Sequence, residues 1–153
     1  DVNGLILLKT TIPENDCSTP QRAMNFIETT ISEFLENSAS KSRKLLGCAV
    51  VIAGQYNVHS GILLTAPLLN WPKFKLRANI ETILGCPVIV DNIANALCIN
   101  FVDLIQQKIS NSPNIMLVHV AAGMGASFFI NDGLVDRGGD EGWIRENKNS
   151  RCA

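Results

Sequence analysis

Two short segments carry residues suited to binding a polar ligand. Asp91-Asn92 follows an apolar run at residues 87–90 and precedes a helical pattern. This pair either caps the helix, which is worth about 1 kcal/mol, or holds the hydroxyl groups of a ligand, and both interpretations stay open. In the segment Ala121-Ala122-Gly123-Met124-Gly125, the backbone around Gly123 and Gly125 could cradle a phosphate. A tight turn without a ligand is the more common reason for such a segment.

Histidines and cysteines give little support for metal or nucleophile chemistry. His59 and His119 have no metal-ligand spacing to each other or to the cysteines. The cysteines are Cys17, Cys48, Cys86, Cys98 and Cys152. Their number is odd and they form no close pairs, whereas a secreted disulfide framework has an even, clustered set. We therefore expect reduced thiols in a cytoplasmic protein, with Cys48 and Cys98 as small buried side chains.

The elements that would position these residues alternate between strands and helices. Strand-type runs occur at residues 5–8, 45–54, 87–90 and 114–121, and a hairpin is expected at 127–135 around Asn131-Asp132-Gly133. Helical patterns start at Thr19-Pro20, span 74–84 before Gly85, and span 94–109. This order predicts an α/β fold, and the continuous run at 45–54 predicts a strand covered on both faces. Ligands of such sheets bind at the carboxyl ends of strands, which adds Ala53-Gly54 and residues 138–143 as candidate loops.

The composition limits the possible classes of protein. The chain has 153 residues, 46% hydrophobic and 18% charged, which fits one or two small layered domains and excludes disorder. A net charge of −1 without a basic stripe argues against a free-standing nucleic-acid binder. No apolar stretch approaches the roughly 20 residues needed to span a bilayer. Since the chain opens on Asp1 and a strand is expected before the turn at Asn3-Gly4, we expect a fragment.

Five segments, in this order, carry a family resemblance. They are Ala53-Gly54, Gly61 with Ala66-Pro67-Leu68-Leu69-Asn70-Trp71, Asp91-Asn92-Ile93-Ala94-Asn95-Ala96, Gly123-Met124-Gly125 with Asp132-Gly133, and Gly139-Asp140-Glu141-Gly142-Trp143-Ile144. Together they resemble the ROK family of repressors, open reading frames and sugar kinases. The resemblance implies an incomplete actin-like ATPase (ribonuclease H-like) fold, with residues 1–112 in a partial N-terminal lobe and 113–153 starting the C-terminal lobe.

The departures from the family pattern concern catalysis. In family kinases an Asp follows the Asn of the third motif and acts as the general base toward the sugar hydroxyl. The matching residue is Ile93, which cannot accept a proton. Asn92 and Ala94-Asn95-Ala96 fix this register, so Asp91 is the less favoured candidate for the base. We expect no catalytic residue.

The resemblance leaves a reduced sugar site. Gly54, Asn92 and Asp140 keep hydrogen-bonding roles, and Trp143 either forms an apolar wall or packs in the core. Leu68 and Trp143 stand where the family has a sugar-binding Asn and a His that also reaches its zinc site. We expect no zinc, because the lone Cys152 offers one ligand where a structural site needs four. We also expect no ATP and magnesium, because Ala121-Ala122 replaces a Gly-Thr pair and only Gly123 and Gly125 remain phosphate-loop-like.

These observations favour a sugar-sensing, effector-binding or dimerisation domain of a ROK-family transcriptional regulator without kinase activity. A repressor needs only sugar binding that biases a conformational equilibrium. One alternative is an ATP-dependent sugar kinase of glucokinase or N-acetylhexosamine kinase type, and another is a degenerate member that binds no sugar. The expected partners are a small sugar or N-acetylated sugar and a second copy of the chain. DNA would bind only through a helix-turn-helix that is not in this chain, and no membrane is expected.

Overall fold

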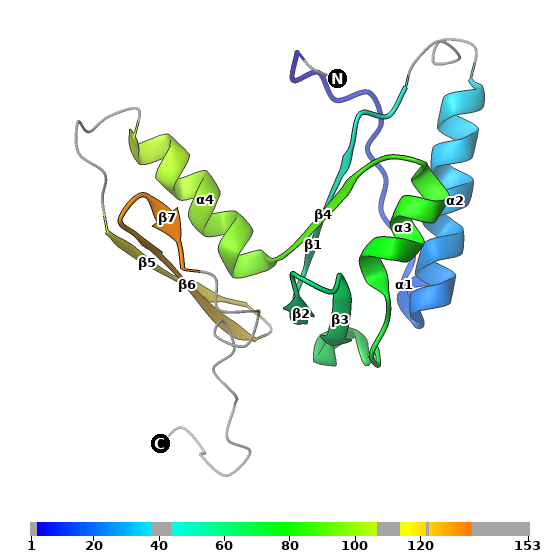
Figure 1. Ribbon diagram of the computed structural model, residues 1–153. Helices are drawn as coiled ribbons and strands as arrows, with labels where there is room; N and C mark the ends of the chain where they lie inside the picture. Colours follow the sequence, from blue (N-terminus) through cyan, green and yellow to red (C-terminus); the bar gives the residue numbers. More distant parts are fainter. Residues whose placement is uncertain (1–2, 38–43, 107–113, 122, 136–153) are drawn as a thin grey trace.

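A computed structural model describes residues 3–37, 44–106, 114–121 and 123–135 (Figure 1). Its elements are α1 (Glu14–Cys17), α2 (Pro20–Glu36), β1 (Cys48–Ile52), β2 (Gln55–Asn57), β3 (Ile62–Thr65), the 3-10 helix η1 (Pro67–Leu69), α3 (Leu76–Leu84), β4 (Val88–Asn92), α4 (Ile93–Gln106), β5 (Ile115–Val120), β6 (Met124–Ile130) and β7 (Gly133–Leu134). None of these helices combines the length and the apolar character needed to cross a membrane. The α/β prediction is confirmed.

The predicted strand at residues 5–8 is wrong. This segment has no regular structure, and its four apolar side chains are 39% to 74% exposed. Its sequence is apolar enough for a strand, but none of the described sheets includes it. Strand propensity therefore could not decide the structure here.

Helix α2 begins where the sequence predicts. Thr19 has an extended backbone with φ −141°, and its Oγ1 accepts a hydrogen bond from the Arg22 amide at 3.3 Å. Pro20 occupies the first helical position, where its missing N–H costs nothing. The helix then buries Ala23 and Met24 against the core of the β1–β4 region.

Strands β1 and β4 form a parallel pair in the register Cys48↔Val88 to Ile52↔Asn92. Helices α2 and α3 contribute to the core on one face of this pair. The other face carries Ala49, Val51 and Ile89, and Ile89 is 73% exposed. The prediction of a strand covered on both faces is therefore wrong for the described residues.

The two cysteines that were expected to be buried differ in exposure. Cys98 is buried in α4 as expected, whereas Cys48 is only half-buried on β1. Burial, followed by the nearby Cys86 thiol, raises the pKa of Cys48. The four cysteines of the described residues are free thiols.

The sequence pattern did not reveal the hairpin of β2 and β3, which follows β1 at Gly54. Arg77 of α3 holds the turn of this hairpin in place, because its guanidinium donates to the carbonyl oxygens of Val58 and His59 at 3.2 Å. Phe74 pairs with Leu63 as an isolated bridge, so α3 starts at Leu76 and not at residue 74. Gly85 ends α3 in the left-handed region, at φ 61°, as predicted.

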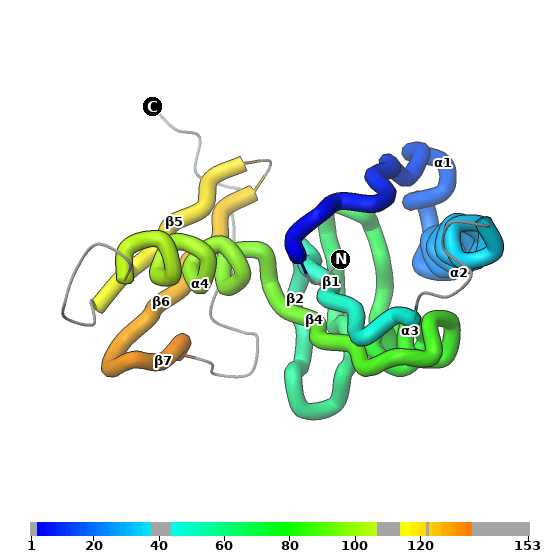
Figure 2. The backbone as a smooth tube through the Cα atoms, turned by 90° about the horizontal axis from the view of Figure 1, so that it is seen from above, coloured from blue at the N-terminus to red at the C-terminus, as the bar shows by residue number. Residues whose placement is uncertain are grey.

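The last strands form a separate antiparallel sheet, in the order β5-β6-β7. Asn131 and Asp132 make the predicted hairpin turn with φ 51° and 63°. Helix α4 packs against β5 and β6, as Figures 1 and 2 both show. The predicted division of the chain after residue 112 stays a prediction, and α4 precedes that position while contacting the strands that follow it.

Candidate functional site

Asn92 ends β4 and caps α4. Its Oδ1 accepts a hydrogen bond from the Ala94 amide at 2.8 Å, and its Nδ2 donates to the Gly54 carbonyl oxygen at 3.1 Å. An Asn side chain has two N–H donors and two acceptor lone pairs. One donor and one lone pair therefore remain beyond these two bonds, so the capping role and a ligand-binding role are compatible.

Gly54 is a glycine because the backbone passes close to the end of β3. A Cβ added to Gly54 would lie 2.5 Å from the Thr65 carbonyl oxygen and 3.2 Å from Ala66 Cα. The residue is buried, and its carbonyl oxygen accepts the Asn92 bond. The structure thus brings Gly54 and Asn92 together, beside the segment that leads to Leu68. Leu68 lies in η1 and is 54% exposed.

A chain of polar side chains continues from this junction toward the second sheet. Asp91 Oδ1 accepts from the Asn92 amide at 2.6 Å and from Asn95 Nδ2 at 2.9 Å. Asn95 Oδ1 in turn accepts from the Ser127 hydroxyl at 2.7 Å. We call Gly54, Asn92, Asp91, Asn95 and Ser127 the polar chain.

Sequence reasoning treated Asn95 only as part of a motif and missed Ser127. Asp91 and Asn95 are four positions apart across the start of α4, and this short separation is a usable signal for their contact. Nothing in the local pattern singles out Ser127, because it lies 32 residues further along in an otherwise apolar strand. Only the packing of α4 on β6 brings it to Asn95.

The position matched to the family's general base offers no proton acceptor. Ile93 is the first residue of α4 and is half-buried. The neighbouring Asp91 carboxylate already accepts two hydrogen bonds through Oδ1. This engagement gives Asp91 a structural role at the start of the helix.

The segment with Gly123 and Gly125 forms the connection between β5 and β6. Gly125 lies within β6 and pairs with His119, and the Ala121 amide donates to the Gly123 carbonyl oxygen at 2.8 Å. These contacts give the tight-turn interpretation a direct structural basis. A phosphate-binding role for Gly123 and Gly125 stays a prediction.

Several predicted residues lie outside the described residues: Asp140, Trp143 and Cys152. Of the predicted sugar-binding set, the structure therefore places only Gly54 and Asn92, and it places them in direct contact. Within the described ranges, no three His, Cys, Asp or Glu side chains are grouped so that they could hold a metal ion.

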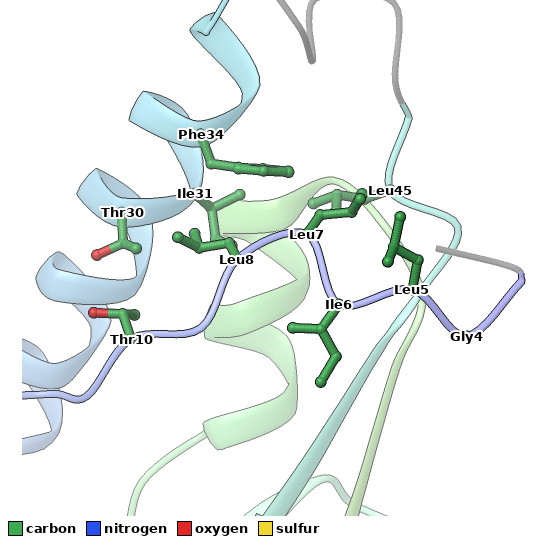
Figure 3. A pocket seen from close by; sticks show the side chains of 10 residues that line it. All are labelled: Gly4, Leu5, Ile6, Leu7, Leu8, Thr10, Thr30, Ile31, Phe34 and Leu45. Atoms are coloured by element: carbon green, nitrogen blue, oxygen red, sulfur yellow. The ribbon is translucent and has the colours of Figure 1, made fainter.

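Two other features of the first region lie apart from these residues. A groove of about 520 Å³ is lined mostly by apolar side chains of residues 4–10 and of α2, among them Leu7, Ile31 and Phe34 (Figure 3). The Tyr56 hydroxyl is buried, with no hydrogen-bond partner in the described part of the chain. Burial raises the pKa of Tyr56, and the opposing effect of Arg77 is smaller.

Comparison with solved structures gives the fold. The chain superimposes on a ROK family transcriptional regulator, a homologue of the E. coli MLC protein, with a TM-score of 0.70 and 22% identity, over 88% of this chain and 35% of that chain. It also superimposes on a ROK family glucokinase from Streptomyces griseus, in complex with glucose and AMPPNP, with a TM-score of 0.64 and 22% identity, over 91% of this chain and 42% of that one. The fold is therefore the actin-like ATPase fold of these proteins, and the chain spans less than half the length of either.

Sequence comparison points to the same family. A candidate xylose repressor from Caldicellulosiruptor sp. (strain Rt8B.4) is 32% identical over 66 residues, which is 43% of this chain and 16% of that protein. The sequence profile of the ROK family matches residues 2–146. A match over nearly the whole chain, together with the fold and the ordered motifs, shows that this chain belongs to the ROK family.

Proposed function

We propose that the chain is the sugar-sensing part of a ROK-family transcriptional regulator and has no kinase activity. The observation that carries this proposal is Ile93 at the first position of α4. The cap at Asn92 fixes the start of the helix, and Ile93 therefore takes the first helical position, where the family kinases have their general base. A regulator tolerates this loss, because binding alone can shift its equilibrium between conformations.

The similarities to regulators support this choice. The superposition on the ROK family transcriptional regulator and the sequence match to the candidate xylose repressor both fit it. By this proposal the ligand is a small sugar or N-acetylated sugar, and the protein acts in carbohydrate metabolism as a homo-oligomer. DNA contact belongs to a helix-turn-helix outside this chain, and a cytoplasmic location, without ATP, magnesium or zinc, is part of the same proposal.

The alternative function is an ATP-dependent sugar kinase. One observation favours it, namely the likeness of the fold to the glucokinase solved with glucose and AMPPNP. For this alternative the chain must supply a base elsewhere, and Asp91 is the nearest carboxylate to the matched position. The two functions therefore differ in whether the protein turns over ATP.

A coupled kinase assay on the full-length protein separates them. With ATP, magnesium and a panel of hexoses and N-acetylhexosamines, we expect no turnover above background, since loss of a general base typically costs about 10²–10⁴ in rate. Turnover near one per second would contradict the proposal. Abolition of that turnover by Asp91→Asn would then identify Asp91 as the base.

Calorimetry across the same panel tests the sugar site. We expect weak binding, on the order of millimolar or about −4 kcal/mol, because two or three hydrogen bonds barely offset the desolvation of the sugar. Asn92→Ala and Asp140→Ala should each weaken it. The matched control is Asn100→Ala, because Asn100 is exposed on the same helix α4. Micromolar binding that survives both substitutions would place the site elsewhere.

A further inference from the structure

Ser127 is a buried polar residue beside apolar side chains on the face of the sheet that packs against α4. It is 2% exposed, and among the described residues no other polar or charged residue is buried. Its strand partner Leu117 and its neighbour Phe129 are apolar. A hydroxyl in such a place is costly unless it is hydrogen-bonded, and its partner is Asn95 at 2.7 Å. The bond therefore fixes how α4 lies on β6.

The direction of every bond in the polar chain follows from chemistry. The Asp91 carboxylate only accepts, so Asn95 must turn its Nδ2 toward it and its Oδ1 toward Ser127, whose hydroxyl then donates. At the other end, the Ala94 amide only donates and the Gly54 carbonyl only accepts, which fixes both ends of the Asn92 amide group. The two parts of the polar chain meet at the backbone of Asn92, because Asp91 Oδ1 accepts from the backbone N–H of Asn92 and not from its side chain.

The polar chain crosses the one covalent junction between the two groups of elements. β4 ends at Asn92 and α4 begins at Ile93 without an intervening loop. Gly54, Asp91 and Asn92 lie before this junction, whereas Asn95 and Ser127 lie beyond it. A rotation of α4 and the β5–β6 sheet about the junction must therefore break the bond between Asn95 and Asp91.

We infer that Asn95 and Ser127 are positioning residues, which hold Asn92 in place through Asp91 and so make the Gly54–Asn92 end of β4 move together with the β5–β6 sheet. The inference rests on the proposed function in one respect: the sugar is the ligand that contacts Asn92. When the sugar binds and displaces Asn92, the hydrogen bonds through Asp91 and Asn95 displace Ser127 and its strand β6 as well. In the free protein the same bonds hold the Asn92 backbone, while Gly54 and Ala94 orient its side-chain amide.

The first test requires no sugar. The NMR exchange rate of the Asn92 backbone amide proton, which is donated to Asp91 Oδ1, is measured on the full-length protein for wild type, Ser127→Ala, Ser127→Thr and Ser60→Ala. Ser127→Ala removes the donor three hydrogen bonds away from the Asn92 amide, and we expect exchange at Asn92 to rise about fivefold, the equivalent of one hydrogen bond of about 1 kcal/mol. Ser127→Thr keeps a hydroxyl and should restore slow exchange. Ser60→Ala, in the exposed turn between β2 and β3, should leave Asn92 unchanged.

The second test adds the sugar. For the tightest-binding sugar of the panel, Ser127→Ala should weaken binding about fivefold and Ser60→Ala should not. If Ser127→Ala does not fold, Asn95→Ala replaces it, since Asn95 is only half-buried and the same hydrogen bonds are removed. Unchanged exchange at Asn92 in a folded variant, or an equal rise in Ser60→Ala, would overturn the inference. If wild type binds no sugar, the proposed function fails, and the exchange rates alone decide the positioning role.

Discussion

The two groups of elements on either side of the β4–α4 junction are stabilised differently. In the first, residues 3–92, large apolar side chains are fully buried: Met24, Leu63, Leu76 and Ile80. In the second, among the described residues of 93–135, the largest fully buried side chain is that of Cys98, and Ser127 is also buried. The first group therefore has a core of large buried side chains, while the helix and sheet of the second group bury smaller ones, namely Ala94, Cys98, Val102 and Ser127.

The outer face of the second sheet strengthens the contrast. Six apolar side chains lie on it and are exposed: Met116, Val118, Val120, Met124, Phe128 and Ile130. Because little apolar area is removed from water in this group, its geometry depends more on directional hydrogen bonds. Burial of large side chains stabilises the first group, and the polar chain positions the second.

The largest effect is expected in the core of the first group. Leu63→Ala should lower the free energy of unfolding by about 3 kcal/mol, since Leu63 is 0% exposed and its removal leaves a cavity. Leu64→Ala, at the next residue and 37% exposed, is the matched control and should cost much less. Denaturant unfolding measures both. Equal losses would show that the first group has no specific core at β3.

A smaller effect is expected in the polar chain. Asn95→Asp keeps the size of the side chain but sets a second carboxylate against Asp91, in place of a donor 2.9 Å away. We expect a loss of about 2 kcal/mol, from one broken hydrogen bond and the repulsion of like charges. Asn100→Asp introduces the same charge at an exposed position of α4. If thermal unfolding does not distinguish the two variants, the polar chain does not stabilise the second group.

The smallest effect concerns the unpartnered hydroxyl of the first group. Tyr56→Phe removes a buried O–H that has no hydrogen-bond partner in the described chain, so we expect stability to stay equal or to rise by about 1 kcal/mol. Ser127→Ala, which removes a bonded hydroxyl, should instead destabilise. A clear loss for Tyr56→Phe would show that its hydroxyl has a partner beyond the described residues.

Much of the fold could be predicted from local patterns. Thr19-Pro20 predicts the start of α2 and Gly85 predicts the end of α3, because the preference for a cap or for a left-handed backbone depends on residue type. The hairpin after β6 follows from Asn131-Asp132-Gly133 for the same reason. Residues 5–8 and the β2–β3 hairpin were not predicted correctly, because strands depend on partners that are distant in sequence.

The candidate site divides in the same way. The sequence by itself determined that Ile93 would follow Asn92 and that the pair Asp91-Asn92 would precede a helix, because these relations extend over only a few residues of chain. Only the tertiary structure decided that Gly54 receives the Asn92 amide and that Ser127 meets Asn95. These contacts join residues 38 and 32 positions apart, and they exist because β1 pairs with β4 and α4 packs on β6. Hydrogen-bonding capacity is a property of each residue, whereas the partner it finds depends on how the elements pack.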